Sequence, residues 1–251
     1  MYDPPVRIAV LMPAYNEAGR LLDTLTELCR DRGDAEICVF LVDDGSTPPL
    51  ARDELRAAAG AMPIVLARHA VNLGQGAAIE TARQLALRPR FSLHNAPFDA
   101  FVTMDSDGQH RPCDVLALAR AIADGADVAL GNRFAGGSNV PLSRRLLLAF
   151  ARSFERVTTG LALSDAHNGL RAFSARAITR MHLTHNRMAH ATEFTQQISR
   201  ASRNGERLGV IEVPVSVRYT DASRAKGQKA SGAVAIVVDL FHGFLFGKGS
   251  P

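Results

Sequence analysis

The sequence predicts an α/β fold in which a mostly parallel sheet carries helices on both faces. Three observations support this prediction. Short apolar runs alternate with segments of helical spacing through the first half of the chain. The 251 residues are 47% apolar and 22% charged, which is ordinary for a globular protein. No internal repeat and no linker rich in proline and serine divides the chain, so we expect a single domain.

The elements expected in the first half follow one another as strand, helix and strand. Residues 6–12 form an apolar run that ends before Pro13, and residues 36–42 form a second run rich in β-branched side chains. Between them, the apolar residues of 17–29 recur at helical spacing. The further elements expected are a strand at 62–67, a helix at 75–87, a strand at 98–104, a helix at 113–123 and a strand at 126–130.

The pattern loosens beyond Arg133. We expect a loop at 136–139, a helix at 142–158, a strand at 169–173, a helix at 192–202 and a strand at 210–217. The apolar tail at 230–247 is just long enough for a membrane span, but Asp239 and His242 lie near its middle. Because a carboxylate at the bilayer centre is costly, we expect an amphipathic helix over 231–251 that packs on protein or lies on a membrane surface.

The cysteine and charge content excludes several classes of protein. Cys29, Cys38 and Cys113 show no CxxC or Cys/His spacing, so neither a disulfide framework nor a structural zinc site is expected. The net charge of +4 is spread along the chain without a basic run, so nucleic acid is not expected as a partner. The first residues lack a basic segment followed by a long apolar stretch, and we expect no signal peptide and a cytoplasmic location.

Polar residues follow three of the expected strands at their carboxyl ends. The segments are Pro13–Glu17 (PAYNE), 43–46 (DDGS) and 105–109 (DSDGQ). In a parallel sheet these ends meet at one edge, which is where such sheets bind ligands, so up to five carboxylates gather there. Each segment alone is also an ordinary turn, but all three at one edge favour a functional site.

Asp105 and Asp107 are separated by one residue, so both carboxylates can turn toward a common point. Mg²⁺ and Mn²⁺ prefer oxygen ligands, and one or two carboxylates plus substrate phosphates hold them in many proteins. Gln109 offers a further carbonyl oxygen. The sequence therefore predicts a Mg²⁺ or Mn²⁺ site that neutralises charge on a departing pyrophosphate.

Other protein families that have aspartates at strand ends or glycine-rich turns fit this sequence less well. A haloacid-dehalogenase phosphatase carries its DxD motif after the first strand, and here it follows the fourth. Gly74 and Gly76 lack both the GxGxxG spacing and the lysine of a P-loop, so neither a dinucleotide site nor a Walker site is expected.

Taken together, these motifs resemble the inverting glycosyltransferases of family 2, which have the GT-A (Rossmann-like) fold. Within that family they resemble the dolichol-phosphate mannose synthase-like, or polyprenyl-phosphate, glycosyltransferases. The matching segments are 10–17 (VLMPAYNE), 41–46 (LVDDGS), 72–76 (NLGQG), 105–110 (DSDGQH), 131–134 (GNRF), 168–173 (NGLRAF), 210–215 (VIEVPV) and 223–227 (SRAKG). The resemblance implies one GT-A domain over 1–230, with a nucleotide-sugar half at 1–133 and an acceptor half at 134–230.

The resemblance also implies roles for individual residues. The residues implied to hold the nucleotide are Pro13, Tyr15, Glu17, Val42, Asp44, Asp105, Ser106, Arg133, Arg218 and Lys226. The metal ligands implied are Asp105, Asp107 and Gln109. Arg133 matches an arginine that contacts phosphate, while Lys226 and, with a less secure alignment, Arg218 would close over the pyrophosphate.

The acceptor decides which further groups the chemistry needs. A lipid phosphate is already an anionic nucleophile and needs only positioning by cations such as Arg171. A sugar hydroxyl needs a base, for which Asp165 and Glu193 are the candidates, although Asp165 can equally orient Arg171.

The function predicted is therefore metal-dependent, inverting transfer of a hexose from a UDP- or GDP-linked sugar to a polyprenyl phosphate. One alternative is transfer to a hydroxyl of a glycan or lipid-linked oligosaccharide in cell-envelope polysaccharide synthesis. A second is a non-catalytic nucleotide-sugar binding or scaffold subunit. The chain lacks the QxxRW motif of processive synthases and the carboxyl-terminal spans of many polyprenyl-phosphate enzymes. Membrane contact would then be peripheral, through the tail or a partner, and an oligomer is left open.

Overall fold

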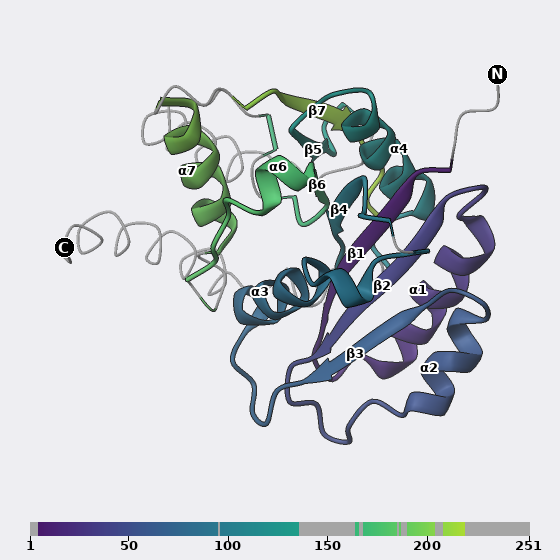
Figure 1. The fold of residues 1–251 in the computed structure, drawn as a ribbon. Coiled ribbons are helices and arrows are strands. Elements are labelled where there is room, and N and C mark those ends of the chain that lie inside the picture. Colours follow the sequence, from purple (N-terminus) through teal and green to yellow (C-terminus); the bar gives the residue numbers. More distant parts are fainter. Residues whose placement is uncertain are drawn as a thin grey trace.

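The computed structural model describes residues 5–94, 96–135, 164–165, 168–184, 186, 190–203 and 208–218. Its elements are β1 (Arg7–Ala14), α1 (Ala18–Asp31), β2 (Glu36–Asp43), α2 (Arg52–Ala59), β3 (Ile64–Arg68), α3 (Gln75–Ala86), η1 (Pro89–Phe91), β4 (Ala100–Thr103), α4 (Pro112–Ala123), β5 (Val128–Asn132), β6 (Arg171–Phe173), α6 (Ala175–Ile178), α7 (His190–Arg203) and β7 (Val210–Pro214). Strands and helices alternate as the sequence predicts (Figure 1).

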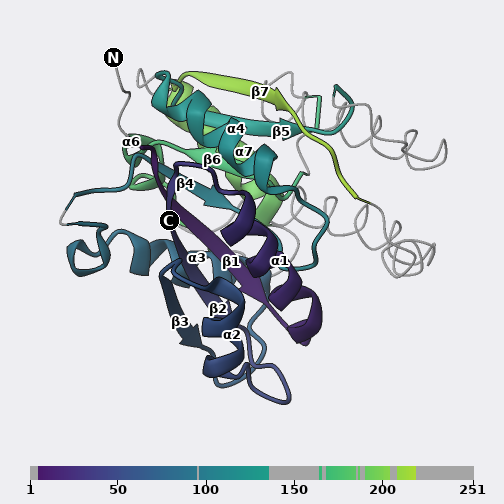
Figure 2. The ribbon, with the colours of Figure 1, turned by 90° about the vertical axis from the view of Figure 1, so that its right-hand side faces the viewer.

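The described strands form one mixed sheet in the order β3-β2-β1-β4-β6-β5-β7. Figure 2 shows β3 at one end of this sheet and β7 at the other. β1, β2, β3 and β4 run parallel, and β5 is parallel to β7. The predicted mostly parallel sheet is therefore confirmed.

β6 is the exception, because it runs antiparallel to both β4 and β5. Its first residue, Arg171, pairs with Thr103 at the end of β4 and with Leu130 in β5. The amino end of β6 therefore reaches the same edge as the carboxyl ends of its neighbours. This direction brings the segment before β6, which includes Asn168 and Gly169, to the edge where the functional motifs gather.

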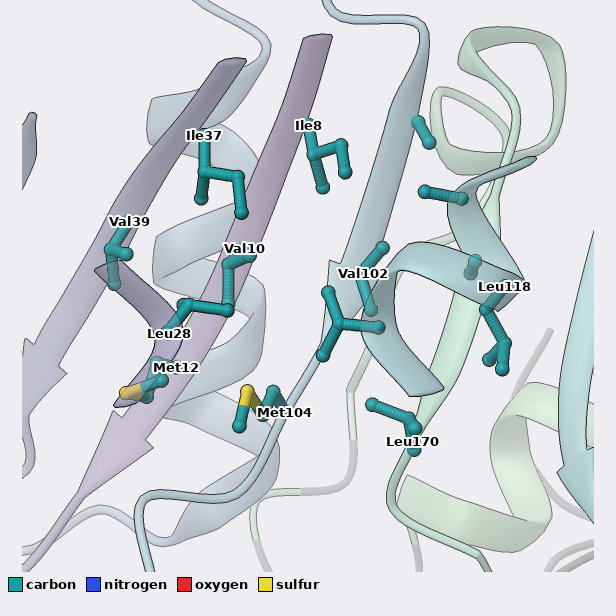
Figure 3. Packing of buried hydrophobic residues seen from close by; sticks show 14 of the residues in the cluster. Ile8, Val10, Met12, Leu28, Ile37, Val39, Val102, Met104, Leu118 and Leu170 are labelled. Atoms are coloured by element: carbon teal, nitrogen blue, oxygen red, sulfur yellow. The ribbon is translucent and has the colours of Figure 1, made fainter. Parts of the chain in front are cut away.

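Successive side chains of each strand point to opposite sides of the sheet. The sheet therefore has two apolar faces, and helices cover both. On one face, Ile8, Val10 and Met12 pack with residues of α1, α2 and α4, among them Leu28 and Leu118 (Figure 3). The side chains of the other face belong to a second buried cluster that includes residues of α3, α6 and α7. The two clusters hold the loops at the edge in fixed positions.

The differences from the expected elements have simple physical causes. β1 continues through Pro13, which pairs in register with Val42. α2 was not expected because it buries few residues, Leu55 and Ala59. α6 is four residues long, too short to show the periodicity of a helix in its sequence.

The helix expected at 142–158 and the tail at 231–251 lie outside the described residues. Across the part of the chain that is described, every helix falls short of what a membrane crossing requires.

Candidate functional site

The ends of β1, β2 and β4 meet at one edge of the sheet, as their parallel pairing requires. Ala14 pairs with Asp43, and the Met104 N–H donates to the Leu11 carbonyl at 3.1 Å. The three polar segments that begin there therefore lie side by side. A contact between two of the loops fixes them further, because Ser46 Oγ accepts from the Asn16 N–H at 3.0 Å.

Asp43 shapes its own loop. Its carboxylate accepts from the N–H groups of Ser46, at 2.8 Å, and Leu50, at 3.2 Å. Arg68 Nε lies 3.4 Å from the same carboxylate, which is buried. Asp43 thus stabilises the turn after β2.

Asp44 connects that turn to the loop before α3. Its buried carboxylate accepts from the N–H groups of Leu73, at 3.0 Å, and Gly74, at 2.8 Å, and lies 2.7 Å from His69 Nδ1. Gly45 allows the turn after β2 to pack against the backbone at Val71, because a Cβ there would lie 2.6 Å from the carbonyl carbon of Val71. Its φ of +78° also favours glycine. In this structure the Asp44 oxygens accept hydrogen bonds from the protein itself. The contact of Asp44 with a nucleoside stays a prediction.

Asp105 and Asp107 lie together at the end of β4. Asp105 Oδ1 accepts from Gln75 Nε2 at 2.7 Å, and Oδ2 lies 3.4 Å from His110 Nε2. Asp107 accepts from both the backbone and the side-chain amide of Gln109. Burial raises the pKa of Asp107, and the neighbouring carboxylate of Asp105 raises it further.

Burial and the adjacent carboxylate disfavour the charged form of Asp107, and a divalent cation bound between the two carboxylates would favour it. Within the described residues, no three His, Cys, Asp or Glu side chains are grouped to hold a metal ion by themselves. Two carboxylates nevertheless fit a cation that takes its other ligands from substrate phosphates. Gln109, predicted as a ligand, turns its amide toward Asp107 and supports that carboxylate in this structure.

The other residues expected around a nucleoside differ in their exposure. Pro13 and Val42 are buried neighbours in the sheet. The Tyr15 ring is 48% exposed at the edge, whereas Glu17 is partly buried. Ser106 is also buried, and its carbonyl accepts from the Thr24 hydroxyl at 3.4 Å. The contact of Tyr15 with a nucleoside base stays a prediction.

Arg133 and Asp165 form a buried ion pair beyond β5. Arg133 donates to Asp165 Oδ2 from its backbone N–H, at 3.0 Å, and from Nε, at 2.7 Å. Asn168 Nδ2 donates to the same oxygen at 3.3 Å, while Asp165 Oδ1 is buried and has no hydrogen-bond partner. In this structure the Asp165 carboxylate pairs with Arg133, and its expected role in orienting Arg171 stays a prediction.

Arg171 and Glu193 are also buried. The guanidinium carbon of Arg171 lies 5.1 Å from the ring centroid of Phe194, a cation–π contact. Both oxygens of Glu193 accept from the Thr184 N–H at 3.0 Å, and Oε1 accepts from the Thr184 hydroxyl at 2.6 Å. Glu193 thereby stabilises the segment before α7.

Arg218 contacts α1 through its side chain. Its guanidinium donates two hydrogen bonds to Glu27, at 2.8 and 2.7 Å, which raises the pKa of Arg218 and lowers that of Glu27. The Arg218 N–H donates to the Gln109 carbonyl at 2.9 Å. The guanidinium of Arg218 pairs with Glu27 in this structure, and its expected contact with a pyrophosphate stays a prediction. Lys226 lies outside the described residues.

The model of the glycosyl transferase family 2 matches residues 9–181, which include the carboxylate pair and Arg133. The chain belongs to glycosyltransferase family 2. Family 2 membership makes it an enzyme that transfers a glycosyl group, and it confirms the resemblance predicted from the motifs.

Curated relatives of this family 2 chain act on lipid-linked phosphates. It is 30% identical to the polyprenol monophosphomannose synthase of Mycolicibacterium smegmatis, over 94% of this chain and 87% of the relative. It is also 30% identical to the undecaprenyl-phosphate mannosyltransferase of Micrococcus luteus, over 93% of this chain and 91% of the relative.

A solved structure shares the fold. Glucosyl-3-phosphoglycerate synthase of Mycobacterium tuberculosis, in complex with Mn²⁺, UDP and phosphoglyceric acid, superposes with a TM-score of 0.59 at 15% identity. The match covers 94% of this chain and 78% of that one. Another structure of that enzyme contains Mg²⁺ and UDP.

The sequence reasoning missed one supporting residue of this family 2 site. Glu212 in β7 accepts from the N–H groups of Ser164, at 2.6 Å, and Asp165, at 3.3 Å, and from Asn132 Nδ2 at 3.4 Å. It fixes the backbone that carries Asp165 against β5. The available signal was a carboxylate inside the apolar run of 210–215.

Proposed function

We propose that this glycosyltransferase moves a hexose from a UDP- or GDP-linked sugar to a polyprenyl phosphate, with inversion at C1 and with Mg²⁺ or Mn²⁺. The observation that carries the proposal is the adjacent carboxylate pair Asp105 and Asp107 at the end of β4, where burial and the neighbouring Asp105 carboxylate raise the pKa of Asp107. The named activities of the two mannosyltransferase relatives support the lipid phosphate as acceptor.

The residues fall into two groups. The donor side comprises the loops after β1, β2 and β4, with Tyr15 for the base and Asp105 and Asp107 for the cation. The acceptor side comprises Arg133, Asp165, Arg171 and Glu193. A cation bound by the two aspartates supplies Lewis acidity at the diphosphate when it is present.

The transfer is a single displacement. An oxygen of the acceptor phosphate forms a bond to C1, the bond from C1 to the donor's phosphate oxygen breaks, and the nucleoside diphosphate leaves with the electron pair. Arg171 brings positive charge to the acceptor side, where the phosphate is proposed to bind, while Asp165 offsets the charge of Arg133. Because the acceptor phosphate is anionic at neutral pH, the transfer needs no base.

The contacts of the candidate bases favour a phosphate over a hydroxyl acceptor. A base must accept a proton at an oxygen that faces the acceptor. Both Glu193 oxygens already accept from Thr184, and Asp165 Oδ2 accepts from Arg133. Asp165 Oδ1 has no hydrogen-bond partner, but it is buried. These contacts support positioning roles for the two carboxylates. A lipid acceptor also implies peripheral membrane contact on the cytoplasmic face, and the tail at 231–251 is proposed to provide it.

The test is a nucleotide-release assay with the full chain, Mn²⁺ or Mg²⁺, and UDP- and GDP-linked hexoses, with and without short-chain polyprenyl phosphate. We expect release that requires both metal and lipid phosphate, loss of it in Asp107→Asn, and no loss in Asp53→Asn, an exposed carboxylate on α2. Release that a glycan hydroxyl stimulates and lipid phosphate does not would overturn the acceptor. Donor binding without turnover would favour a non-catalytic subunit.

A further inference from the structure

Three residues surround the carboxylate of Asp105, and two of them, Gln75 and Gly169, are distant in sequence. Gln75, from the first turn of α3, donates its side-chain amide to Oδ1 at 2.7 Å. His110, from the loop before α4, has Nε2 at 3.4 Å from Oδ2. Gly169, before β6, packs so closely that a Cβ there would lie 2.5 Å from Oδ2. The side chain therefore has little freedom to rotate.

Gln75 occupies a fixed position at the start of α3. The preceding residue, Gly74, has a φ of +104° and donates its N–H to the Asp44 carboxylate at 2.8 Å. The following residue, Gly76, is buried and donates its N–H to the Asn186 carbonyl at 2.9 Å. Because the backbone is held on both sides, the Gln75 amide reaches Asp105 from a preset direction.

We propose that Gln75 is a positioning residue for the metal site, which orients the Asp105 carboxylate toward the cation that it shares with Asp107. This inference rests on the proposed metal-dependent function. The amide donates one N–H to Oδ1 and carries no charge, so it fixes the carboxylate without competing with a cation for its negative charge. Groups that orient a ligand in this way are commonly worth 10–100-fold in metal affinity, on the order of the effect expected here.

Gly74 and Gln75 also connect the loop after β2 to the carboxylate pair at the end of β4. Gly74 donates to Asp44, and Gln75 donates to Asp105. Asp44 fixes the loop at 71–74, and that loop sets the first turn of α3 from which Gln75 extends. The orientation of Asp105 is thereby tied to the loop after β2, where the nucleoside is proposed to bind.

The experiment is a titration of the full chain with Mn²⁺ in the presence of saturating UDP or GDP, followed by the electron paramagnetic resonance signal of free Mn²⁺. Gln75→Leu removes the donor at similar side-chain volume. Gln84→Leu is the matched control, since Gln84 lies exposed on the same helix and donates to the carboxylate of Glu80 at 2.9 Å. Melting temperature without metal is measured for each variant.

We expect Gln75→Leu to raise the Kd for Mn²⁺ by about 10-fold or more while its melting temperature stays that of the wild type, and release to recover at high Mn²⁺. Gln84→Leu should bind Mn²⁺ as the wild type does. An unchanged Kd in Gln75→Leu, or an equal rise in Gln84→Leu, overturns the role of Gln75 alone. A wild-type chain that binds no Mn²⁺ with either nucleotide overturns the proposed metal-dependent function as well.

Discussion

The carboxylates of the donor side and of the acceptor side are balanced in different ways. Asp105 and Asp107 lie beside each other, and the donors that hold them include the neutral amides of Gln75 and Gln109. Asp165 instead has the guanidinium of Arg133 at 2.7 Å. Two carboxylates thus adjoin each other on one side, whereas a carboxylate adjoins a guanidinium on the other.

This difference teaches that a buried carboxylate near a site does not by itself indicate catalysis. Two adjacent, partly buried carboxylates are costly to the folded protein, and such a cost is typical of a functional site. A compensated pair is costly only when one member is removed. Substitution should therefore impair mainly chemistry on the donor side and mainly stability on the acceptor side.

The largest effect is expected for Asp107→Asn. Loss of a metal ligand removes several kcal/mol of charge stabilisation, so metal-dependent nucleotide release should fall by about 10³-fold. The melting temperature of the metal-free protein should stay the same or rise, because one of two repelling carboxylates is gone. A stable variant that keeps wild-type release would break the assignment of the donor side.

Asp165→Asn should act mainly on stability. Removing the charge leaves Arg133 buried beside a neutral amide, and breaking a buried pair in this way costs about 3 kcal/mol or more. For a chain of this size the melting temperature should fall by roughly 6–12 °C. Circular dichroism melting checks it. A variant that melts like the wild type but loses all release would make Asp165 a catalytic group instead.

Gly169→Ala, beside Asp105, can be compared with Gly19→Ala, which lies outside the site. The added Cβ displaces the Asp105 carboxylate, so Mn²⁺ affinity should fall about tenfold, the order of other disturbances of a metal ligand's support. Gly19→Ala, in α1 with open space around it, should instead stabilise the fold by up to about 1 kcal/mol. Equal Mn²⁺ affinity in both variants would contradict the cradle around Asp105.

The smallest effect is expected at the ion pair of Glu27 and Arg218, whose side chains are 22% and 43% exposed. Glu27→Gln should cost about 0.5 kcal/mol at neutral pH, because solvent screens the pair. The Glu27 pKa is lowered in the folded state, so its contribution is present above the ordinary value of 4.5 and is lost as the pH falls through the lowered pKa. Urea unfolding at pH 7 and pH 3 measures both differences.

Much of the donor side could be predicted from sequence because it follows from local pattern. Apolar runs that end in polar segments identify the strand ends, and parallel pairing brings those ends together. Asp105 and Asp107 are two residues apart, so their proximity also needed no knowledge of the fold.

The acceptor side could not be predicted in the same way, because its contacts join residues that no local pattern relates. Arg133 and Asp165 are 32 positions apart, and Glu212 meets Asp165 across 47. The antiparallel direction of β6 depends on the path of the chain before it. Gln75 likewise reaches Asp105 across 30 positions.

The contrast between the two sides is tested most directly by calorimetric titration of UDP and GDP with Mn²⁺ into the wild type, Asp107→Asn and Asp165→Asn, each below its melting temperature. The account predicts that Asp107→Asn remains folded and loses metal-dependent nucleotide binding, whereas folded Asp165→Asn retains it. Metal-dependent binding that survives in Asp107→Asn and vanishes in folded Asp165→Asn would contradict it.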